Sequence, residues 1–196
     1  MRRFNIGIDV DGVIIDYMVT VRAQAELYDY LELHGSGLID KEAPKVRERY
    51  GWSKEVTKTF ADKYFVPLSV TAPYNPLAIE VMKMLQNDGH DLNVISNRGL
   101  IHEEATTVVE NRFKKSDIIF SNFYWKIEDK TSIMIENNIN IIIDDSYDVC
   151  MEAANKGLYA IYFREKGSKI IKHEKVFDVD NWGEIYRVIT ELSKTL

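Results

Sequence analysis

Two aspartates, Asp9 and Asp11, stand one residue apart directly after a short apolar run, and Gly12 follows them at once. In an extended backbone, side chains two residues apart point to the same side. The two carboxylates are therefore expected close together, at the point where a strand leaves its sheet. Two like charges so placed are unfavourable unless a cation or a shared proton relieves them. The pair predicts a site for metal binding and chemistry rather than a contact kept for stability.

Polar side chains also end two later apolar runs. Ser96 follows one of them, and Asp144 and Asp145 follow the other. In an open parallel sheet, ligands bind beyond the carboxyl ends of the strands, which share one edge. If the three runs are strands of one sheet, all of these side chains meet at that edge together with the first aspartate pair.

The residue types at this edge predict chemistry on a phosphate group. Four carboxylates without a histidine or cysteine cluster form an oxygen-rich site, which suits Mg²⁺ rather than zinc. The four histidines of the chain are scattered and lack the spacing of metal ligands. Mg²⁺ on one or two carboxylates usually completes its shell with water and substrate phosphate. A carboxylate beside it can attack phosphorus, and a lysine can balance the charge of the phosphoryl oxygens.

Two lysines could supply that positive charge. Lys126 and Lys130 both precede the apolar run that ends at Asp144, at plausible distances. Either of them, taken alone, is equally well a solvated lysine near the start of a helix. The residues themselves leave the choice open.

Apolar runs and helical patterns alternate along most of the chain, and this order predicts the elements that position the polar groups. Such alternation is typical of an α/β fold with a Rossmann-like, mostly parallel sheet covered by helices on both faces. Strands are expected at 4–10, 91–96, 117–120, 139–143 and 158–163. Helices are expected at 76–87, 102–114, 130–137, 149–156 and 182–196.

The stretch 16–74 interrupts this alternation. It contains helical patterns at 17–33, 43–50 and 54–64 and no convincing strand. We therefore expect an α/β core made of 1–15 and 75–196, with a helical cap inserted at 16–74. Such a cap could close over the first strand to exclude water and select the substrate. The alternative is a helical subdomain that merely packs on the side.

Composition narrows the class of protein. The chain has 196 residues, 45% of them hydrophobic, and a net charge of −6, which argues against a binder of nucleic-acid polymers. No apolar run approaches the roughly 20 residues that span a bilayer, so no membrane association is expected. Cys150 is the only cysteine, which excludes an internal disulfide and suits a cytoplasmic location. A small anionic metabolite remains a suitable partner, and a homodimer is compatible with the sequence.

The ordered motifs resemble those of the haloacid dehalogenase (HAD) superfamily. The matching segments are Asp9-Val10-Asp11-Gly12-Val13, then Ser96, a later lysine and Asp144-Asp145. The DxDG form is similar to the phosphatase branch. More closely, the chain resembles the 5′(3′)-deoxyribonucleotidase group and its uncharacterised bacterial relatives. The segments that carry this closer likeness are Ile95-Ser96-Asn97-Arg98, Asp129-Lys130-Thr131, Asp144-Asp145-Ser146 and Asn181-Trp182.

The resemblance implies roles for the aspartates. Asp9 would be the nucleophile that forms an aspartyl-phosphate, and Asp11 the general acid and base. Mg²⁺ would be held by the Asp9 side chain, the Asp11 main-chain carbonyl and Asp145. Asp144 would lie beside the metal and orient the lysine or a metal-bound water.

The resemblance also assigns the phosphate-binding groups. Ser96 would bind phosphoryl oxygens, and Lys130, within Asp129-Lys130-Thr131, matches the family pattern better than Lys126. Arg98 could reach the substrate phosphate or lie on the surface after the strand. The aromatic residues of the cap carry no matching motif, and packing within the cap is the expected role for most of them.

These features together predict a Mg²⁺-dependent phosphohydrolase that acts on a nucleoside 5′-monophosphate, with a deoxyribonucleotide as the leading substrate. Another small phosphate ester, such as a sugar phosphate, is the alternative within the same chemistry. Transfer of the phosphoryl group to an acceptor other than water would use the same Asp9 intermediate. A rival of a different class is a non-catalytic regulatory protein that binds a metal or phosphate on the same fold.

Overall fold

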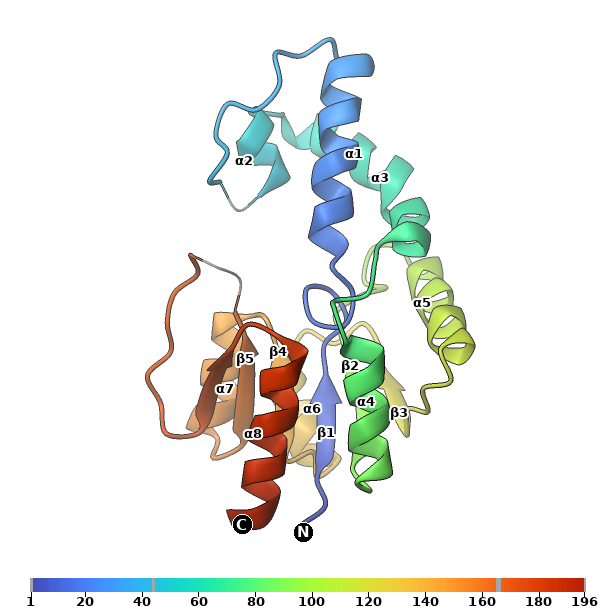
Figure 1. Cartoon of the computed structure of the whole chain (residues 1–196). Coiled ribbons are helices and arrows are strands. Elements are labelled where there is room, and N and C mark those ends of the chain that lie inside the picture. The colour runs from blue at the N-terminus through green and yellow to red at the C-terminus, as the bar shows by residue number, and fades with distance from the viewer. Residues whose placement is uncertain (1, 44, 165–166, 196) are drawn as a thin grey trace.

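A parallel sheet of six strands forms the centre of the computed structural model, which describes residues 2–43, 45–164 and 167–195 (Figure 1). The strand order is β3-β2-β1-β4-β5-β6. Each neighbouring pair is parallel, so all carboxyl ends face the same edge. The strands are β1 (Asn5–Ile8), β2 (Asp91–Ile95), β3 (Asn122–Tyr124), β4 (Ile141–Asp144), β5 (Tyr159–Phe163) and β6 (Val176–Val179).

Helices cover both faces of the sheet and bury its central strands on both sides. On one face, α4, α5 and α8 pack against Ile6 and Ile8 of β1 in the larger hydrophobic cluster. On the other face, α6 and α7 pack against Ile95 and Ile142. These helices are α4 (Ala78–Asn87), α5 (Glu104–Lys115), α6 (Lys130–Glu136), α7 (Tyr147–Asn155) and α8 (Trp182–Thr195). The predicted α/β fold is therefore confirmed.

The third strand lies further along the chain than predicted. The expected strand at 117–120 is wrong, and β3 pairs with β2 only from Asn122. Asp117 has a φ of 55°, so the chain turns sharply after α5. The apolar side chains that follow Asp117 pack into the hydrophobic core before the chain reaches the edge of the sheet. This burial explains why their composition resembles that of a strand. The edge strand β6 had no counterpart among the predicted strands.

Three helices lie between β1 and α4, above the carboxyl ends of the strands (Figure 1). They are α1 (Tyr17–Leu31), α2 (Val46–Tyr50) and α3 (Lys54–Thr71), and they fall within 16–74, which we call the insertion. An aromatic cluster made of Tyr28, Tyr50, Trp52, Phe60 and Tyr64 holds them together, with Tyr50 as its member from α2. The division of the chain into two domains stays a prediction.

The third helix of the insertion runs two turns past its predicted end. It continues beyond residue 64 to Thr71 and contains Pro67. Proline removes one helical hydrogen bond and usually ends or kinks a helix. Packing of α3 against α5 of the core keeps this helix going. The added turns carry Phe65 and Ser69, which matter for the site described below.

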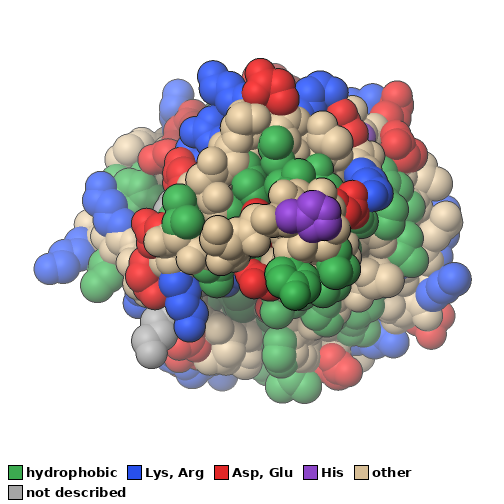
Figure 2. Space-filling view, turned by 90° about the horizontal axis from the view of Figure 1, so that it is seen from above, with side chains coloured by type: hydrophobic (Ala, Val, Ile, Leu, Met, Phe, Trp, Pro, Cys, Tyr) green, Lys and Arg blue, Asp and Glu red, His purple; other side chains and the backbone are tan. Residues whose placement is uncertain are grey.

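The face of the molecule on the side of the insertion has a mixed surface. Hydrophobic side chains gather near its middle, and charged side chains of both signs surround them (Figure 2). Among the helices of the described residues, none is both long and apolar enough to cross a membrane.

Candidate active site

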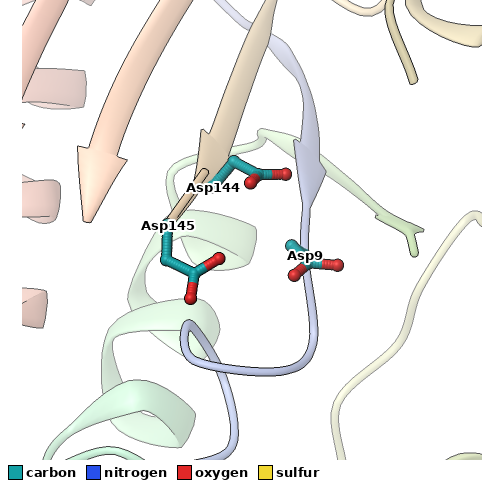
Figure 3. A group of neighbouring side chains, drawn as sticks. All are labelled: Asp9, Asp144 and Asp145. Atoms are coloured by element: carbon teal, nitrogen blue, oxygen red, sulfur yellow. The ribbon is translucent and has the colours of Figure 1, made fainter. Parts of the chain in front are cut away.

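Three carboxylates converge where β1 and β4 end. Asp9 follows β1 directly, and its N–H donates to the carbonyl of Ile143 over 2.9 Å, which continues the pairing of the two strands. Asp144 is the last residue of β4, and Asp145 follows it. One oxygen from each of the three carboxylates lies within 4.8 Å of the other two (Figure 3). The two strand ends therefore meet as the sequence predicted.

Lys130 lies among these carboxylates. Its Nζ is 2.9 Å from Asp9 Oδ1 and 2.7 Å from Asp144 Oδ2, and the side chain is buried. Burial alone would lower the pKa of Lys130, but Asp9 and Asp144 outweigh it and raise that pKa. Lys130 is therefore charged, at the first position of α6. The Nζ of Lys126 instead pairs with Glu103 Oε1, 2.7 Å away on the surface.

The acidic cluster carries more negative charge than one lysine balances. Asp144 is fully buried, and its Oδ1 accepts the N–H of Ser146 over 2.8 Å. Asp145 is the exposed member and opens on a cavity. Its partial removal from water, together with the charges of Asp9 and Asp144, raises the pKa of Asp145 to about 8. Carboxylate oxygens so crowded fit a hard divalent cation such as Mg²⁺.

Gly12 makes room for this arrangement. It has a φ of +84°, and a Cβ at this position would stand 2.1 Å from Asp145 Oδ2. A side chain here is thus excluded twice, by backbone conformation and by contact. This explains in physical terms why a glycine follows the aspartate pair.

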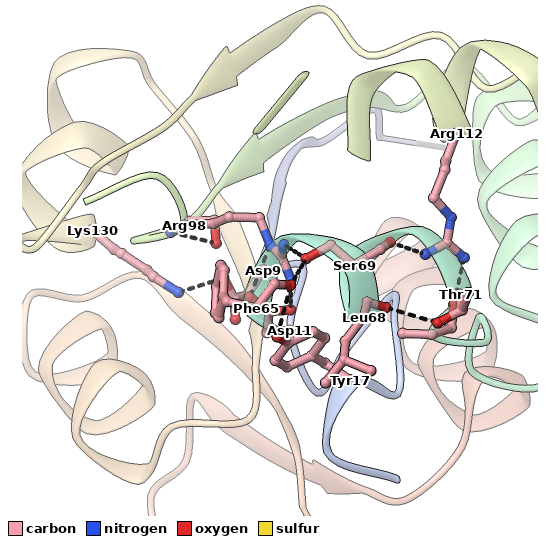
Figure 4. Close-up of polar contacts among 12 residues, drawn as sticks. Asp9, Asp11, Tyr17, Phe65, Leu68, Ser69, Thr71, Arg98, Arg112 and Lys130 are labelled. Carbon is pink, nitrogen blue, oxygen red and sulfur yellow. Dashed lines mark hydrogen bonds and ion pairs between the residues drawn. The ribbon is translucent and has the colours of Figure 1, made fainter. Parts of the chain in front are cut away.

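Asp11 turns away from Lys130 and pairs with Arg98 instead (Figure 4). Arg98 Nε donates to Asp11 Oδ2 over 3.1 Å, and Arg98 Nη2 donates to Asp11 Oδ1. Burial raises the pKa of Asp11, although the guanidinium opposes this shift. The sequence left Arg98 between a phosphate ligand and a surface residue. It is neither exposed nor unpaired, and its only sequence signal was its place two residues after Ser96.

Ser96 lies just behind the site. It is fully buried, and its Oγ accepts the N–H of Arg98 over 3.3 Å, so it supports the loop that begins at Asn97. Asn97 rather than Ser96 is among the residues that line the cavity. The role of Ser96 in binding phosphoryl oxygens stays a prediction.

Two cavities adjoin at this edge of the sheet. The first, of about 560 Å³, is lined by the acidic cluster, Asp11 and Lys130 from the core and by Tyr17 and Met18 from the insertion. The second, of about 330 Å³, lies within the insertion and shares Tyr17 and Met18 with the first. Phe60 and Phe65 are further members of its mostly apolar wall. A phosphate ester bound at the carboxylates could therefore extend into an aromatic pocket.

Comparisons with known proteins identify the fold but not a close relative. No protein-family model matches the chain, and no curated protein does. Among solved structures, a haloacid dehalogenase-like hydrolase from Streptococcus pneumoniae has a TM-score of 0.66 at 16% identity, covering 95% of this chain and 98% of that one.

Two further solved structures are similar over nearly their whole length. The HAD hydrolase YfnB from Bacillus subtilis, solved with magnesium bound, gives a TM-score of 0.66 at 14% identity, covering 96% of this chain and all of that one (100%). A protein from Haemophilus somnus, described as a predicted phosphoglycolate phosphatase, gives a TM-score of 0.63 at 14% identity, covering 96% of this chain and 99% of that one. The chain thus has the fold of HAD-superfamily hydrolases, and its likeness to the nucleotidase group stays a prediction.

Proposed function

We propose that this protein is a Mg²⁺-dependent phosphohydrolase in which Asp9 is the nucleophile. The observation that carries the proposal is the placement of Lys130 between Asp9 and Asp144, in a cavity that three carboxylate oxygens share. A charged lysine beside the attacking carboxylate and the incoming phosphate is the electrostatic arrangement that phosphoryl transfer needs. The hydrolase fold of the structural neighbours supports the same class of reaction.

The proposed reaction has two steps. A carboxylate oxygen of Asp9 attacks phosphorus, the bond to the leaving oxygen breaks, and the carboxyl group of Asp11 gives that oxygen a proton. Water then attacks the aspartyl-phosphate, Asp11 takes a proton from it, and phosphate leaves with Asp9 restored. Burial raises the pKa of Asp11, which favours the protonated form that gives this proton.

Asp144 acts through its neighbours in this scheme, because it holds Lys130 and the main chain of Ser146. The Asp9 side chain, Asp145 and the main-chain carbonyl of Asp11 would hold Mg²⁺. When bound, Mg²⁺ neutralises developing charge on the phosphoryl oxygens as a Lewis acid.

A nucleoside 5′-monophosphate, in particular a deoxyribonucleotide, is the substrate that we propose. The aromatic pocket beside the catalytic cavity supports it, because Tyr17, Phe60 and Phe65 offer flat apolar surfaces for a base. A different small phosphate ester is the second candidate, favoured by the neighbour described as a predicted phosphoglycolate phosphatase. The single cysteine supports a cytoplasmic location.

A phosphate-release screen tests the proposal. Nucleoside monophosphates and sugar phosphates are offered to the purified protein, with Mg²⁺ and with a chelator. We expect Mg²⁺-dependent release that is fastest for nucleoside monophosphates. Release from sugar phosphates alone would contradict the proposed substrate but would agree with the proposed reaction. No release from any ester, together with phosphate binding, would favour the regulatory protein.

A further inference from the structure

Every nitrogen of the Arg98 guanidinium has a partner within the protein. Nε and Nη2 donate to the two oxygens of Asp11, and Nη1 donates to Ser69 Oγ over 2.6 Å (Figure 4). The main chain of Arg98 is also held, because its N–H donates to Ser96 Oγ and its carbonyl accepts the N–H of Lys126 over 3.1 Å. Arg98 is 2% exposed, so this is a fixed and buried position.

Most of the surroundings of Arg98 come from the insertion. The guanidinium carbon lies 5.1 Å from the ring centroids of both Tyr17 in α1 and Phe65 in α3, and Ser69 is also in α3. The Phe65 ring also stacks on His102, with 5.1 Å between the ring centroids. One arginine of the core therefore joins a core carboxylate to two helices of the insertion.

Arg98 is not placed to bind the substrate phosphate. It does not line the 560 Å³ cavity, whereas Asp11 and Asn97 do. It lines instead a neighbouring cavity, together with Phe65 and His102, which shares Asp11 with the first. Each of its three nitrogens donates within the protein, and taking it from Asp11 would leave a buried charge without its partner, which is costly.

We propose that Arg98 is a positioning residue, which fixes the carboxyl group of Asp11 and makes proton transfer at the leaving oxygen depend on the placement of α1 and α3. This rests on the proposed function. A bidentate pair between arginine and a carboxylate sets the plane of the carboxyl group as well as its distance. Displacing α3 removes Ser69 and Phe65 from Arg98, and Asp11 then loses its fixed orientation. Arg98 thus links the insertion to the proton transfer by Asp11, and it does not affect the pair formed by Asp9 and Lys130.

The leaving group of the substrate gives a test that a merely structural role would not pass. An aryl phosphate such as p-nitrophenyl phosphate releases an anion that is stable without a proton, whereas a nucleoside monophosphate releases an alkoxide that requires one. We expect Arg98→Ala to lower kcat/KM, which reports the step that expels the leaving group, by about 100-fold for the nucleoside monophosphate and by only about 3-fold for the aryl ester, because general acid catalysis contributes on this scale. Arg98→Lys restores part of the loss.

Arg112 provides the matched control. Its Nη1 donates to the main-chain carbonyl of Ser69 over 2.8 Å, its Nη2 donates to that of Ala72, and its guanidinium lies 4.6 Å from the Tyr74 ring centroid. It therefore joins the core to the same turn of α3 without touching Asp11. Arg112→Ala is expected to change both substrates equally, by less than about 3-fold.

Ser69→Ala keeps the test decisive if Arg98→Ala does not fold. It keeps the pair between Arg98 and Asp11 but removes the hydrogen bond that joins the guanidinium to α3, so it is expected to show the same preference for the aryl ester at about 5-fold. Where Arg98→Ala folds, we expect that adding it to Asp11→Asn causes no further loss on the nucleoside monophosphate.

Three results would overturn the proposal. They are equal losses on both esters, a change in KM alone, and additive losses in the double variant. If the wild type hydrolyses both esters and Asp9→Asn does not, any of these results refutes the role of Arg98 and keeps the proposed function. A wild type inactive on every ester would refute both.

Discussion

The two aspartates that stand one residue apart have different surroundings. Asp9 pairs with Lys130, which also binds Asp144, so every member of this group belongs to the α/β core. Asp11 pairs with Arg98, which also binds Ser69 and packs on Tyr17 in the insertion. The proposed nucleophile thus has all of these partners within the α/β core, whereas the proposed proton carrier depends on contacts between the core and the insertion.

The two cations fit these tasks. Lysine offers a compact charge with three rotatable donors, which lets Lys130 reach two carboxylates and remain beside an incoming phosphate. Arginine offers a rigid planar fork, which fixes a single carboxylate in orientation. The difference indicates that charge matters most at Asp9 and that orientation matters most at Asp11.

Removal of Lys130, the cation that pairs with Asp9 in the core, has the largest expected effect. Lys130→Ala is expected to lower kcat by about 10³-fold, because the phosphoryl oxygens lose their fixed charge. It leaves two buried carboxylates unpaired, so the free energy of unfolding should also fall by about 3–5 kcal/mol. Steady-state kinetics and urea unfolding measure the two effects.

Lys126→Ala is the control for that variant. Lys126 pairs with Glu103 on the surface, and such pairs contribute about 0–1 kcal/mol. Its kcat should stay within about twofold of the wild type. Equal losses from the two lysine variants would contradict the placement of Lys130 as the charge at the site.

Substitution of Gly12 tests whether the acidic cluster tolerates a shift of Asp145. Gly12→Ala adds a methyl group 2.1 Å from Asp145 Oδ2 at a φ of +84°. We expect a loss of about 1–3 kcal/mol in the free energy of unfolding from backbone strain and a weaker affinity for Mg²⁺. Urea unfolding and Mg²⁺ titration measure these changes.

Gly167 separates the strain from the contact in that experiment. It has a φ of +92° and nothing within 4 Å of an added Cβ. Gly167→Ala should therefore show the strain without any loss of Mg²⁺ affinity. If the two variants bind Mg²⁺ equally well, the contact with Asp145 has no part in holding the metal.

The dependence of stability on pH is expected to show a smaller effect. The pKa of Asp145 is raised from 3.8 to about 8, and burial also raises the pKa of Asp144. A raised pKa in the folded state gives stability that is present at low pH and is lost as pH rises through the folded value. The metal-free protein should therefore lose stability as the pH rises from about 4 to about 8, between the unfolded and the folded pKa of Asp145.

Mg²⁺ should offset that loss, because the cation replaces the proton among the carboxylates. We expect the rise in Tm on adding Mg²⁺ to be about 3 °C larger near pH 9 than near pH 6. Thermal unfolding with Mg²⁺ and with a chelator measures it, and Asp145→Asn should flatten the dependence. A rise in Tm that is the same at both pH values would argue against Asp145 as a metal ligand.

The sequence was sufficient to predict which core residues meet. Asp9, Ser96 and Asp144 each follow an apolar run, and parallel strands must end at one edge, so their proximity follows from topology. Lys130 could be distinguished from Lys126 only by resemblance, because nothing in the local pattern of either lysine shows which way its side chain turns.

The contacts of the insertion could not be predicted in the same way. Pro67 suggests the end of a helix, yet packing on α5 carries α3 past it and brings Phe65 and Ser69 to Arg98. The strand after α5 was misplaced because Asp117 takes a left-handed conformation that a propensity for strand does not reveal. In both places tertiary packing determines where the helix or strand lies, and local sequence patterns do not reveal that packing.

The most direct test of the central claim is the rate of phosphate release by the wild type and by Asp9→Asn, measured with Mg²⁺ on the best substrate of the screen. The aspartyl-phosphate mechanism predicts a loss of about 10⁴-fold or more in the variant, because the amide of asparagine cannot replace the attacking carboxylate. A variant that releases phosphate at the wild-type rate would contradict Asp9 as the nucleophile and the mechanism that depends on it.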